Sequence, residues 1–299
     1  MSVADSRERP SSTPHLVSAR RITPSLILSA LAGVFAIAIV ASAAIRAPAL
    51  DWSTFRQYLF SSTVRKGAAN TVLLTILCEA LAIASGAVVA ALLMGSNAVG
   101  RIVGHTYQWT FRSVPELAQL LFWFNLALVF PQFKIGIPFG GPSLWATNMN
   151  TVMTPWTAAI LGIGLHEGAY LAEVFRSGFL SVDRVQIDAA RALGLPRRKL
   201  VVDIIFPQAM RVIAPNAGSR LIGTLKLTAL ASVLAVPELL YSVQSIYSRT
   251  FETIPLLLVA TAWYMLMVGV LRLLQHWLER RYEMPQGAAV DVVGAEALA

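Results

Sequence analysis

Residues Gly168 to Pro215 read GAYLAEVFRSGFLSVDRVQIDAARALGLPRRKLVVDIIFPQAMRVIAP, a charged stretch between two apolar segments of membrane-spanning length. The chain as a whole is 56% apolar and only 13% charged. Long uncharged runs alternate with basic loops, a pattern typical of a protein that crosses a membrane several times. The quoted stretch therefore predicts a polar segment outside the membrane that joins two spans.

Within this stretch, residues 182–203 predict two short helices that meet at a sharp corner. Ser181 belongs to a residue type favoured at helix N-caps, and apolar side chains follow it at helical spacing. These side chains are Val182, Val185, Ala189 and Leu193. Gly194 suits the left-handed residue that ends a helix, and Pro196 suits the first turn of the next one. An ordinary amphipathic surface helix would show the same spacing, but a rigid charged corner between spans favours docking to a partner protein.

Six membrane spans are predicted. The first, residues 25–45, is an uncharged run close to the ~20 residues that a spanning helix needs. Ala41-Ser42-Ala43 resembles a signal-peptidase site, but the run exceeds the ~7–15 apolar residues usual in a signal peptide, so we expect an anchor helix. The other five spans are residues 69–94, 113–131, 154–175, 208–236 and 254–275.

The distribution of Lys and Arg predicts the orientation in the membrane. Six spans place both termini on one side, and if that side is the cytoplasm, the cytoplasmic segments carry 16 basic residues and the external ones six. This bias follows the positive-inside rule and places residues 182–203 in the cytoplasm, where ATP is. Segment 46–68 is an exception with four basic residues. Its amphipathic residues predict that it lies along the membrane interface: Asp51, Trp52, Phe55 and Tyr58.

Other functions are disfavoured because the residues they need are missing. A P-loop holds phosphates with a lysine that follows a glycine, and none of the four lysines does so. His166 and Glu167 resemble part of a zinc-protease helix, but Tyr170 stands where the second histidine would be, so no metal site is expected. Cys78 is the only cysteine, which excludes a disulfide within the chain. The net charge of +8 follows the loops rather than any nucleic-acid motif, so no nucleic-acid partner is expected.

The corner resembles a known family. Asp188-Ala189-Ala190 is followed after three residues by Gly194, and after nine more by Ile204-Ile205-Phe206-Pro207. This spacing resembles the E-A-A-x3-G-x9-I-x-L-P signature of the permease subunits of bacterial ATP-binding-cassette (ABC) importers, with Asp188 replacing Glu and Phe206 replacing Leu. Flanking residues resemble the polar amino acid branch of that family, including Phe111-Arg112-Ser113-Val114-Pro115 and Lys226-Leu227-Thr228-Ala229-Leu230.

The resemblance implies an all-α integral membrane protein with the type I permease fold of ABC importers. Residues 182–203 would be the coupling segment, and the residues that couple to the ATPase would be Asp188, Ala189, Ala190, Gly194, Leu195 and Pro196. The expected organisation is a disordered cytoplasmic N-terminus over 1–24, an extra transmembrane helix and interfacial segment over 25–66, the importer transmembrane domain over 67–280 and a cytoplasmic tail over 281–299.

The resemblance also implies the partners. A permease of this family performs no covalent chemistry and binds no cofactor itself, whereas its ATPase subunits use ATP with Mg²⁺. A second permease subunit, identical or paralogous, and an external solute-binding protein would complete the importer. The assembly would lie in the bacterial inner membrane, with both termini of this chain in the cytoplasm, and would transport a polar amino acid or a related small solute.

Ionisable side chains within spans cost about 2.5–3.5 kcal/mol on insertion scales and usually face protein or water. Those that fall deep in the predicted spans are Glu79, Glu167 and Lys226. Those that fall near span ends are Glu116, Glu173 and Arg220. Two interpretations stay open. Glu167 and Lys226 form a structural ion pair, or they contact a zwitterionic solute in a pathway that also includes Glu79 and Tyr170.

A rival hypothesis is a secondary transporter or channel driven by an ion gradient, in which Glu79 or Glu167 carries protons. A membrane-embedded enzyme is disfavoured because no catalytic set of residues is present. A requirement for ATP and an external binding protein would separate the importer from its rival.

Overall fold

The computed structural model describes residues 31–36, 38–39, 42, 50–136 and 143–282. The chain divides into two units, Met1–Leu50 and Asp51–Ala299. The described residues of the first unit between 31 and 42 are helical. The predictions for residues 1–24, for most of 25–45 and for nearly all of 281–299 lie outside the described residues.

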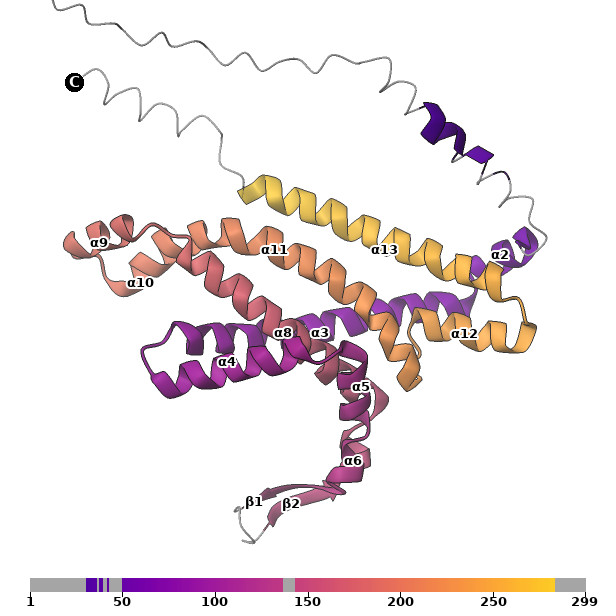
Figure 1. Ribbon diagram of the computed structural model, residues 1–299, viewed down its shortest axis with the longest axis horizontal. Helices are drawn as coiled ribbons and strands as arrows, with labels where there is room; N and C mark the ends of the chain where they lie inside the picture. The colour runs from indigo at the N-terminus through magenta and orange to yellow at the C-terminus, as the bar shows by residue number, and fades with distance from the viewer. Residues whose placement is uncertain (1–30, 37, 40–41, 43–49, 137–142, 283–299) are drawn as a thin grey trace, which may run out of the picture. The chain divides into compact units, whose positions relative to one another are not determined.

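Long apolar helices build the second unit, which confirms the predicted helical membrane fold (Figure 1). They are α3 (Ser62–Met94), α8 (Pro155–Leu180), α11 (Phe206–Leu227) and α13 (Thr253–Tyr282). Among the described residues, four helical segments are long and apolar enough to cross a membrane: Ser62–Met94, Pro155–Leu180, Arg197–Leu234 and Thr253–Arg280. They cover the predicted spans 69–94, 154–175, 208–236 and 254–275.

The predicted span over 113–131 has a different form. Helix α4 (Ala98–Ser113) already runs back along α3. Near its start, Gly100 and Gly104 face Leu92 and Leu93 at the end of α3. Farther along α4, Tyr107 lies beside Ser85, which is nearer the start of α3. The chain then bends at Pro115 into α5 (Glu116–Phe124) and α6 (Leu126–Val129). The return leg is therefore a broken series of short helices that starts at Ala98.

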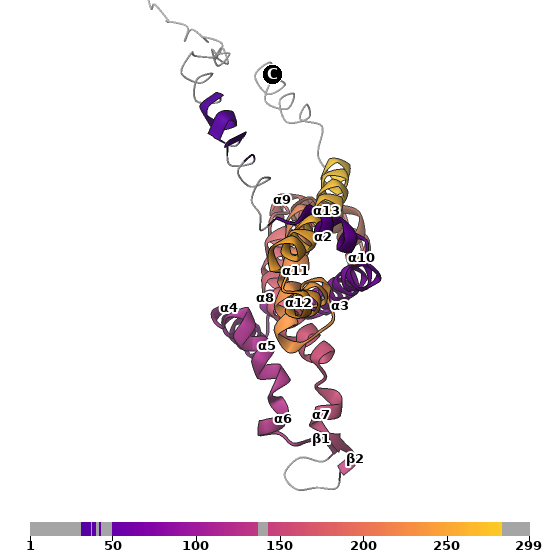
Figure 2. The same ribbon diagram turned by 90° about the vertical axis from the view of Figure 1, so that its right-hand side faces the viewer.

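A β-hairpin interrupts the helical pattern at one end of the unit, which the sequence did not predict. Strands β1 (Gln132–Gly136) and β2 (Ser143–Asn148) are antiparallel and lead through α7 (Met149–Val152) into α8. Figures 1 and 2 both show the hairpin on the side of the unit away from α13. Because α8 runs from the hairpin to the predicted corner, these two features lie at opposite ends of a helix of 26 residues.

Small residues let α3 and α8 pack closely. A Cβ atom on Gly86 would meet the carbonyl oxygen of Gly168 and the Cβ of Leu171, each at 3.0 Å. A Cβ on Gly164 would meet the carbonyl oxygen of Cys78 at 3.0 Å. The neighbours at both positions include backbone or near-backbone atoms that cannot move independently, so the approach of the two helices depends on glycine.

Away from the corner, the unit also contains η2 (Thr228–Leu234), α12 (Leu239–Thr250) and α2 (Trp52–Leu59). The carboxylate of Glu238, which is fully buried, caps α12 by accepting bonds from the backbone N–H groups of Leu240 and Tyr241 at 2.9 and 2.6 Å. The hydroxyl of Tyr264 on α13 donates to the same carboxylate at 2.9 Å. This buried carboxylate therefore ties α12 to α13.

Helix α2 fits the predicted interfacial segment in being amphipathic. Phe55, Tyr58 and Leu59 pack against the core that α13 shares, whereas Arg56 and Gln57 are exposed. Asp51 caps the helix, and hydrogen bonds from Ser53 and Thr54 lower the pKa of its carboxyl to about 2. Since α2 packs on α13, it belongs to the second unit and not with the first span.

The close approach of α3 and α8 predicts the effect of a larger residue at Gly86. We expect Gly86→Val to overpack this interface and lower the free energy of unfolding by about 1–3 kcal/mol. Gly269→Val on α13 is the matched control, because nothing lies within 4 Å of a Cβ there. Thermal unfolding of the purified protein in detergent measures both, and a Gly86→Val protein as stable as wild type would contradict the proposed packing.

Candidate functional site

The predicted corner is present between α8 and α11. Helix α9 (Arg184–Ala192) is followed by its C-cap, Leu193, and then by Gly194 with a φ of +74°. The N–H of Leu195 donates to the carbonyl of Ala190 at 3.1 Å, and the N–H of Gly194 donates to Arg191 at 2.9 Å. These two bonds form a Schellman motif, which satisfies the last carbonyls of the helix and reverses the chain.

The start of each helix at the corner differs from the prediction. Asp183, not Ser181, caps α9, because α8 continues to Leu180 and Ser181 closes it. The Asp183 side chain accepts a bond from the N–H of Val185 at 2.9 Å. Pro196 precedes the second helix instead of lying in its first turn, and that helix, α10 (Arg197–Lys199), has only three residues. A π-helical segment, η1 (Leu200–Ile205), joins it directly to α11.

The apolar face predicted for α9 is not buried in this subunit. Val182 is buried as expected, but Val185 is 73% exposed and Leu193 is 80% exposed, and Ala189 between them is also exposed. Helix α9 is held instead through its opposite side, where Ile187 packs against Val182 and Ala190 is buried. Val185, Ala189 and Leu193 therefore form an outward apolar stripe, and the carboxylate of Asp188 beside it bonds to Arg191 at 3.3 Å.

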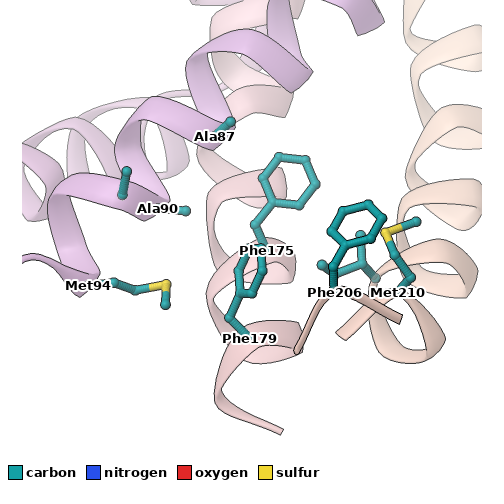
Figure 3. Close-up of a pocket in the computed structure, with 9 residues that line it drawn as sticks. Ala87, Ala90, Met94, Phe175, Phe179, Phe206 and Met210 are labelled. Carbon is teal, nitrogen blue, oxygen red and sulfur yellow. The ribbon is translucent and has the colours of Figure 1, made fainter. Parts of the chain in front are cut away.

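An apolar pocket of about 380 Å³ lies at the base of the corner (Figure 3). Phe175 and Phe179 of α8 face Phe206 and Met210 of α11 across it, with the end of α3 on the third side. Phe206 is the first residue after η1, so the corner and the pocket share a wall. The lining carries no charged side chain, which makes the pocket unsuitable for a polar solute.

Apart from this apolar pocket, a group of polar side chains lies near the middle of α8. Glu167 is almost fully buried at 1% exposure and pairs with Arg220 of α11, with 2.6 Å between carboxylate oxygen and guanidinium nitrogen. The Arg220 guanidinium also lies 4.1 Å from the centre of the Tyr170 ring. The guanidinium of Arg112, from the end of α4, lies 5.0 Å from the centre of the same ring. Two cations from different helices thus converge on one aromatic side chain of α8.

The predicted pair of Glu167 with Lys226 is wrong. Lys226 is exposed and lines a different polar pocket, of about 490 Å³, between α11 and α13. Arg220, which the sequence places near a span end, takes the place of Lys226 as the partner of Glu167. Glu79 is buried and accepts a hydrogen bond from Thr224, one turn after Arg220 on α11, at 3.0 Å. Of the four predicted pathway residues, the structure therefore groups Glu79, Glu167 and Tyr170 and separates Lys226.

His166 takes part in a neighbouring network that links α8 to α5. Its Nε2 lies 3.3 Å from a carboxylate oxygen of Glu116, and its Nδ1 lies 2.9 Å from the carbonyl oxygen of Phe111. The amide of Gln119 donates to that carbonyl at 2.9 Å and to the carbonyl of Val114 at 2.8 Å. These bonds satisfy the backbone carbonyls freed by the bend at Pro115. Among the described residues, no group of three or more potential metal ligands is present.

Arg112 and Arg220 are the residues of this site that the sequence did not identify. In the sequence, Arg112 stands out only as part of the Phe111–Pro115 motif, and Arg220 falls near a span end. Positions 167 and 220 lie on different helices and are 53 residues apart, so no spacing within the sequence relates them. A usable signal was present, because a deep carboxylate in a span requires a cation, and the predicted span 208–236 contains only three, Arg211, Arg220 and Lys226.

Comparisons with known proteins find relatives along most of the chain. Residues 82–284 match the family described as "Binding-protein-dependent transport system inner membrane component". The arginine transport system permease protein ArgU of Corynebacterium glutamicum is 36% identical over 242 residues, which cover 79% of this chain and 73% of ArgU. The histidine/lysine/arginine/ornithine transport system permease protein HisQ of Escherichia coli is 29% identical, over 76% of this chain and 96% of HisQ.

Solved structures show the same architecture. An amino acid ABC transporter crystallised with histidines has a TM-score of 0.65 and 27% identity, covering 78% of this chain and 99% of the matched one. The inward-facing MetNI methionine ABC transporter has a TM-score of 0.59 with 16% identity, over 74% of this chain and 97% of the other. The second likeness is one of fold alone.

The buried ion pair predicts how α8 and α11 depend on each other. Glu167→Gln or Arg220→Met alone leaves one charge without its partner, so each should lower the free energy of unfolding by up to about 3 kcal/mol. The double variant should lose less than the two single losses combined, because no charge is stranded. Thermal unfolding in detergent provides the measurement.

Lys226→Met is the control for this cycle, since among the described residues Lys226 forms no ion pair. It should leave the melting temperature near that of wild type. Strictly additive losses from Glu167→Gln and Arg220→Met would mean that the pair does not hold the helices together.

Proposed function

The chain belongs to the family of binding-protein-dependent transport system inner membrane components, and we propose that it couples to an ATPase through the corner at residues 182–203. In this proposal it is one permease subunit of an ABC importer and forms part of the path by which the solute crosses the membrane. The nucleotide chemistry belongs to partner ATPase subunits that use ATP with Mg²⁺. A second permease subunit and an external solute-binding protein complete the importer.

The outward apolar stripe of α9 supports the coupling role. Val185 and Leu193 are largely exposed on a helix whose other side is packed against the body. Exposed apolar side chains that line one helix face, with charged residues around them, are a typical protein docking surface. Such a surface next to three consecutive basic residues, Arg197 to Lys199, fits a soluble partner better than the membrane interior.

The corner is suited to transmit motion because its attachments are rigid. The Schellman motif fixes the turn at Gly194, and the amide of Gln208 on α11 donates to the Gln186 side chain on α9 at 2.8 Å. The helix after the corner continues through η1 into α11 without a loop. A displacement of α9 would thus move α11, the helix on which Arg220 lies near the middle of the membrane.

The solute is proposed to be an amino acid. The relatives are named for the transport of arginine, of L-cystine and of histidine, lysine, arginine and ornithine. The polar side chains around Tyr170 suit a small zwitterion, because they offer both signs of charge near the middle of a span. We place the protein in the bacterial inner membrane, with both termini in the cytoplasm.

Substitutions at the corner test the proposed coupling. No atom lies within 4 Å of a Cβ on Gly194, so replacement there acts through the backbone and not through a clash. Gly194→Val should cost on the order of 1 kcal/mol or more at a positive φ and re-aim α9, whereas Gly194→Asn should be tolerated because Asn adopts this conformation readily. Leu193→Asp should remove part of the docking stripe. We expect Gly194→Val and Leu193→Asp to reduce ATPase copurification, ATP hydrolysis and uptake, while Gly194→Asn retains them.

Uptake measured in proteoliposomes separates the importer from a transporter driven by an ion gradient. Wild-type uptake should require the ATPase, ATP and the binding protein, and should survive an uncoupler. Asp188→Glu, which keeps the charge, should be nearly silent, whereas Asp188→Lys should impair coupling. Uptake driven by a pH gradient alone would reject the proposed function, and full activity of both Gly194→Val and Leu193→Asp would reject the corner as the coupling element.

The orientation is tested by labelling single cysteines. Leu193→Cys at the corner should react only from the cytoplasmic side, and Ala146→Cys in β2 only from outside, because α8 separates the two positions. Both sites are exposed, and Cys78 is buried and can be replaced to remove background. Labelling of both positions from the same side would contradict this topology.

A further inference from the structure

Arg112 is an arginine with unused hydrogen-bonding capacity near the middle of the second unit. Within the described residues its guanidinium donates no hydrogen bond and forms no ion pair, and its contact is with the face of the Tyr170 ring at 5.0 Å. The side chain is exposed in this subunit. Tyr170 itself is half-buried, with the Arg220 guanidinium also over its ring.

The depth of this group in the membrane restricts what can surround it. Tyr170 lies 15 residues from the first residue of α8 and 10 residues from the last. At a rise of 1.5 Å per residue these separations are about 22 and about 15 Å, so the ring lies well inside the span. A charged guanidinium at that depth cannot face hydrocarbon without a large cost. It therefore faces water or a polar ligand.

The neighbouring carboxylates are already bonded to other groups. Glu167 pairs with Arg220, Glu116 lies against His166, and Glu173 receives Arg176 on both of its oxygens, at 3.1 and 3.5 Å. Glu173 also attracts the charge of Arg112 but makes no ion pair with it. Arg112 is thus the cation at this site whose N–H donors are available to bind a ligand.

The geometry of a guanidinium selects the group that it would bind. Its parallel N–H donors match the two oxygens of a carboxylate, and such bidentate bonds are stronger than neutral ones. The contact with Tyr170 places Arg112 over the ring, and the fixed fork of a guanidinium loses little conformational entropy for each hydrogen bond that it forms. Arg220 at the same ring adds positive potential from the other helix. An ammonium group would be repelled here.

We propose that Arg112, held over the Tyr170 ring, binds the carboxylate of the solute at the middle of the transport pathway. This inference rests on the proposed function, because an amino acid solute supplies the α-carboxylate. It assigns Glu167 and Arg220 a supporting role, in which they position Tyr170 and the local charge but do not contact the solute directly. Lys226, in its separate pocket, has no part in this site.

The test measures solute binding to the purified permease–ATPase complex in nanodiscs without the binding protein, so that the affinity belongs to the permease. Labelled L-arginine, L-histidine and L-cystine are the probes, since relatives are named for their transport. The unlabelled acid and its carboxamide, which lacks the carboxylate charge, compete for the site. We expect wild type to prefer the acid by at least about tenfold. Arg112→Met should lose that preference, and Arg112→Lys should retain part of it.

Arg101→Met is the matched control, because that guanidinium lies near the start of the same helix, α4, and donates to the backbone carbonyls of Gly95 and Ser96 away from the site. It should leave the preference for the acid unchanged. An Arg112→Met complex that still prefers the acid as wild type does would overturn the proposal. The proposal is also overturned if Arg112→Met separates the permease subunits in size-exclusion chromatography while the solute preference is retained. That result would show that the arginine pairs across a subunit interface.

Uptake by wild type distinguishes this failure from failure of the proposed function. If wild type imports a probe with ATP and the binding protein while Arg112→Met keeps the preference, only the carboxylate site is rejected. If wild type neither imports nor binds any of the three amino acids, the amino acid function is rejected together with the site.

Discussion

The ion pair of Glu167 and Arg220 is the interaction on which the centre of this protein depends. Neither group can remain charged inside a membrane-spanning segment without a partner, and the carboxylate is almost completely buried. The pair joins α8 to α11, which are also the helices that lead into and out of the corner. One fixed point in the span thus constrains where both helices end, and with them the position of α9.

Close packing by small residues supplies the second constraint. Within a membrane, helices gain little from hydrophobic burial against each other, so association depends on close contact and on polar bonds. Gly86 and Gly168 bring α3 and α8 near enough for their backbones to touch. Tyr107 of α4 also packs close to α8, and its hydroxyl donates to the carbonyl of Leu165 at 2.7 Å. These contacts set the distance at which Arg112 reaches Tyr170.

The corner and the polar site are linked by continuous helix. From α9 the chain turns at residues 193–196, and α10 then continues through η1 into α11 without an intervening loop. Arg220 lies on that helix, four turns beyond Phe206 at the wall of the apolar pocket. Displacement of α9 by a partner would therefore reach the Tyr170 ring through the corner and the helix that follows it. The π-helical segment η1 is the place along this route where the hydrogen-bonding pattern changes, which is typical of functional bends in helices.

The sequence by itself determined the features that local physics decides. Long apolar runs required membrane helices, and Gly194 required a left-handed turn. Only the tertiary structure decided the partner of Glu167, because a pair between residues on different helices depends on how those helices pack and not on spacing along the chain. The same reason explains why Val185 and Leu193 turned outward. Periodicity shows that a helix has an apolar face, but whether that face meets its own subunit or is left exposed for a partner depends on where the rest of the chain lies.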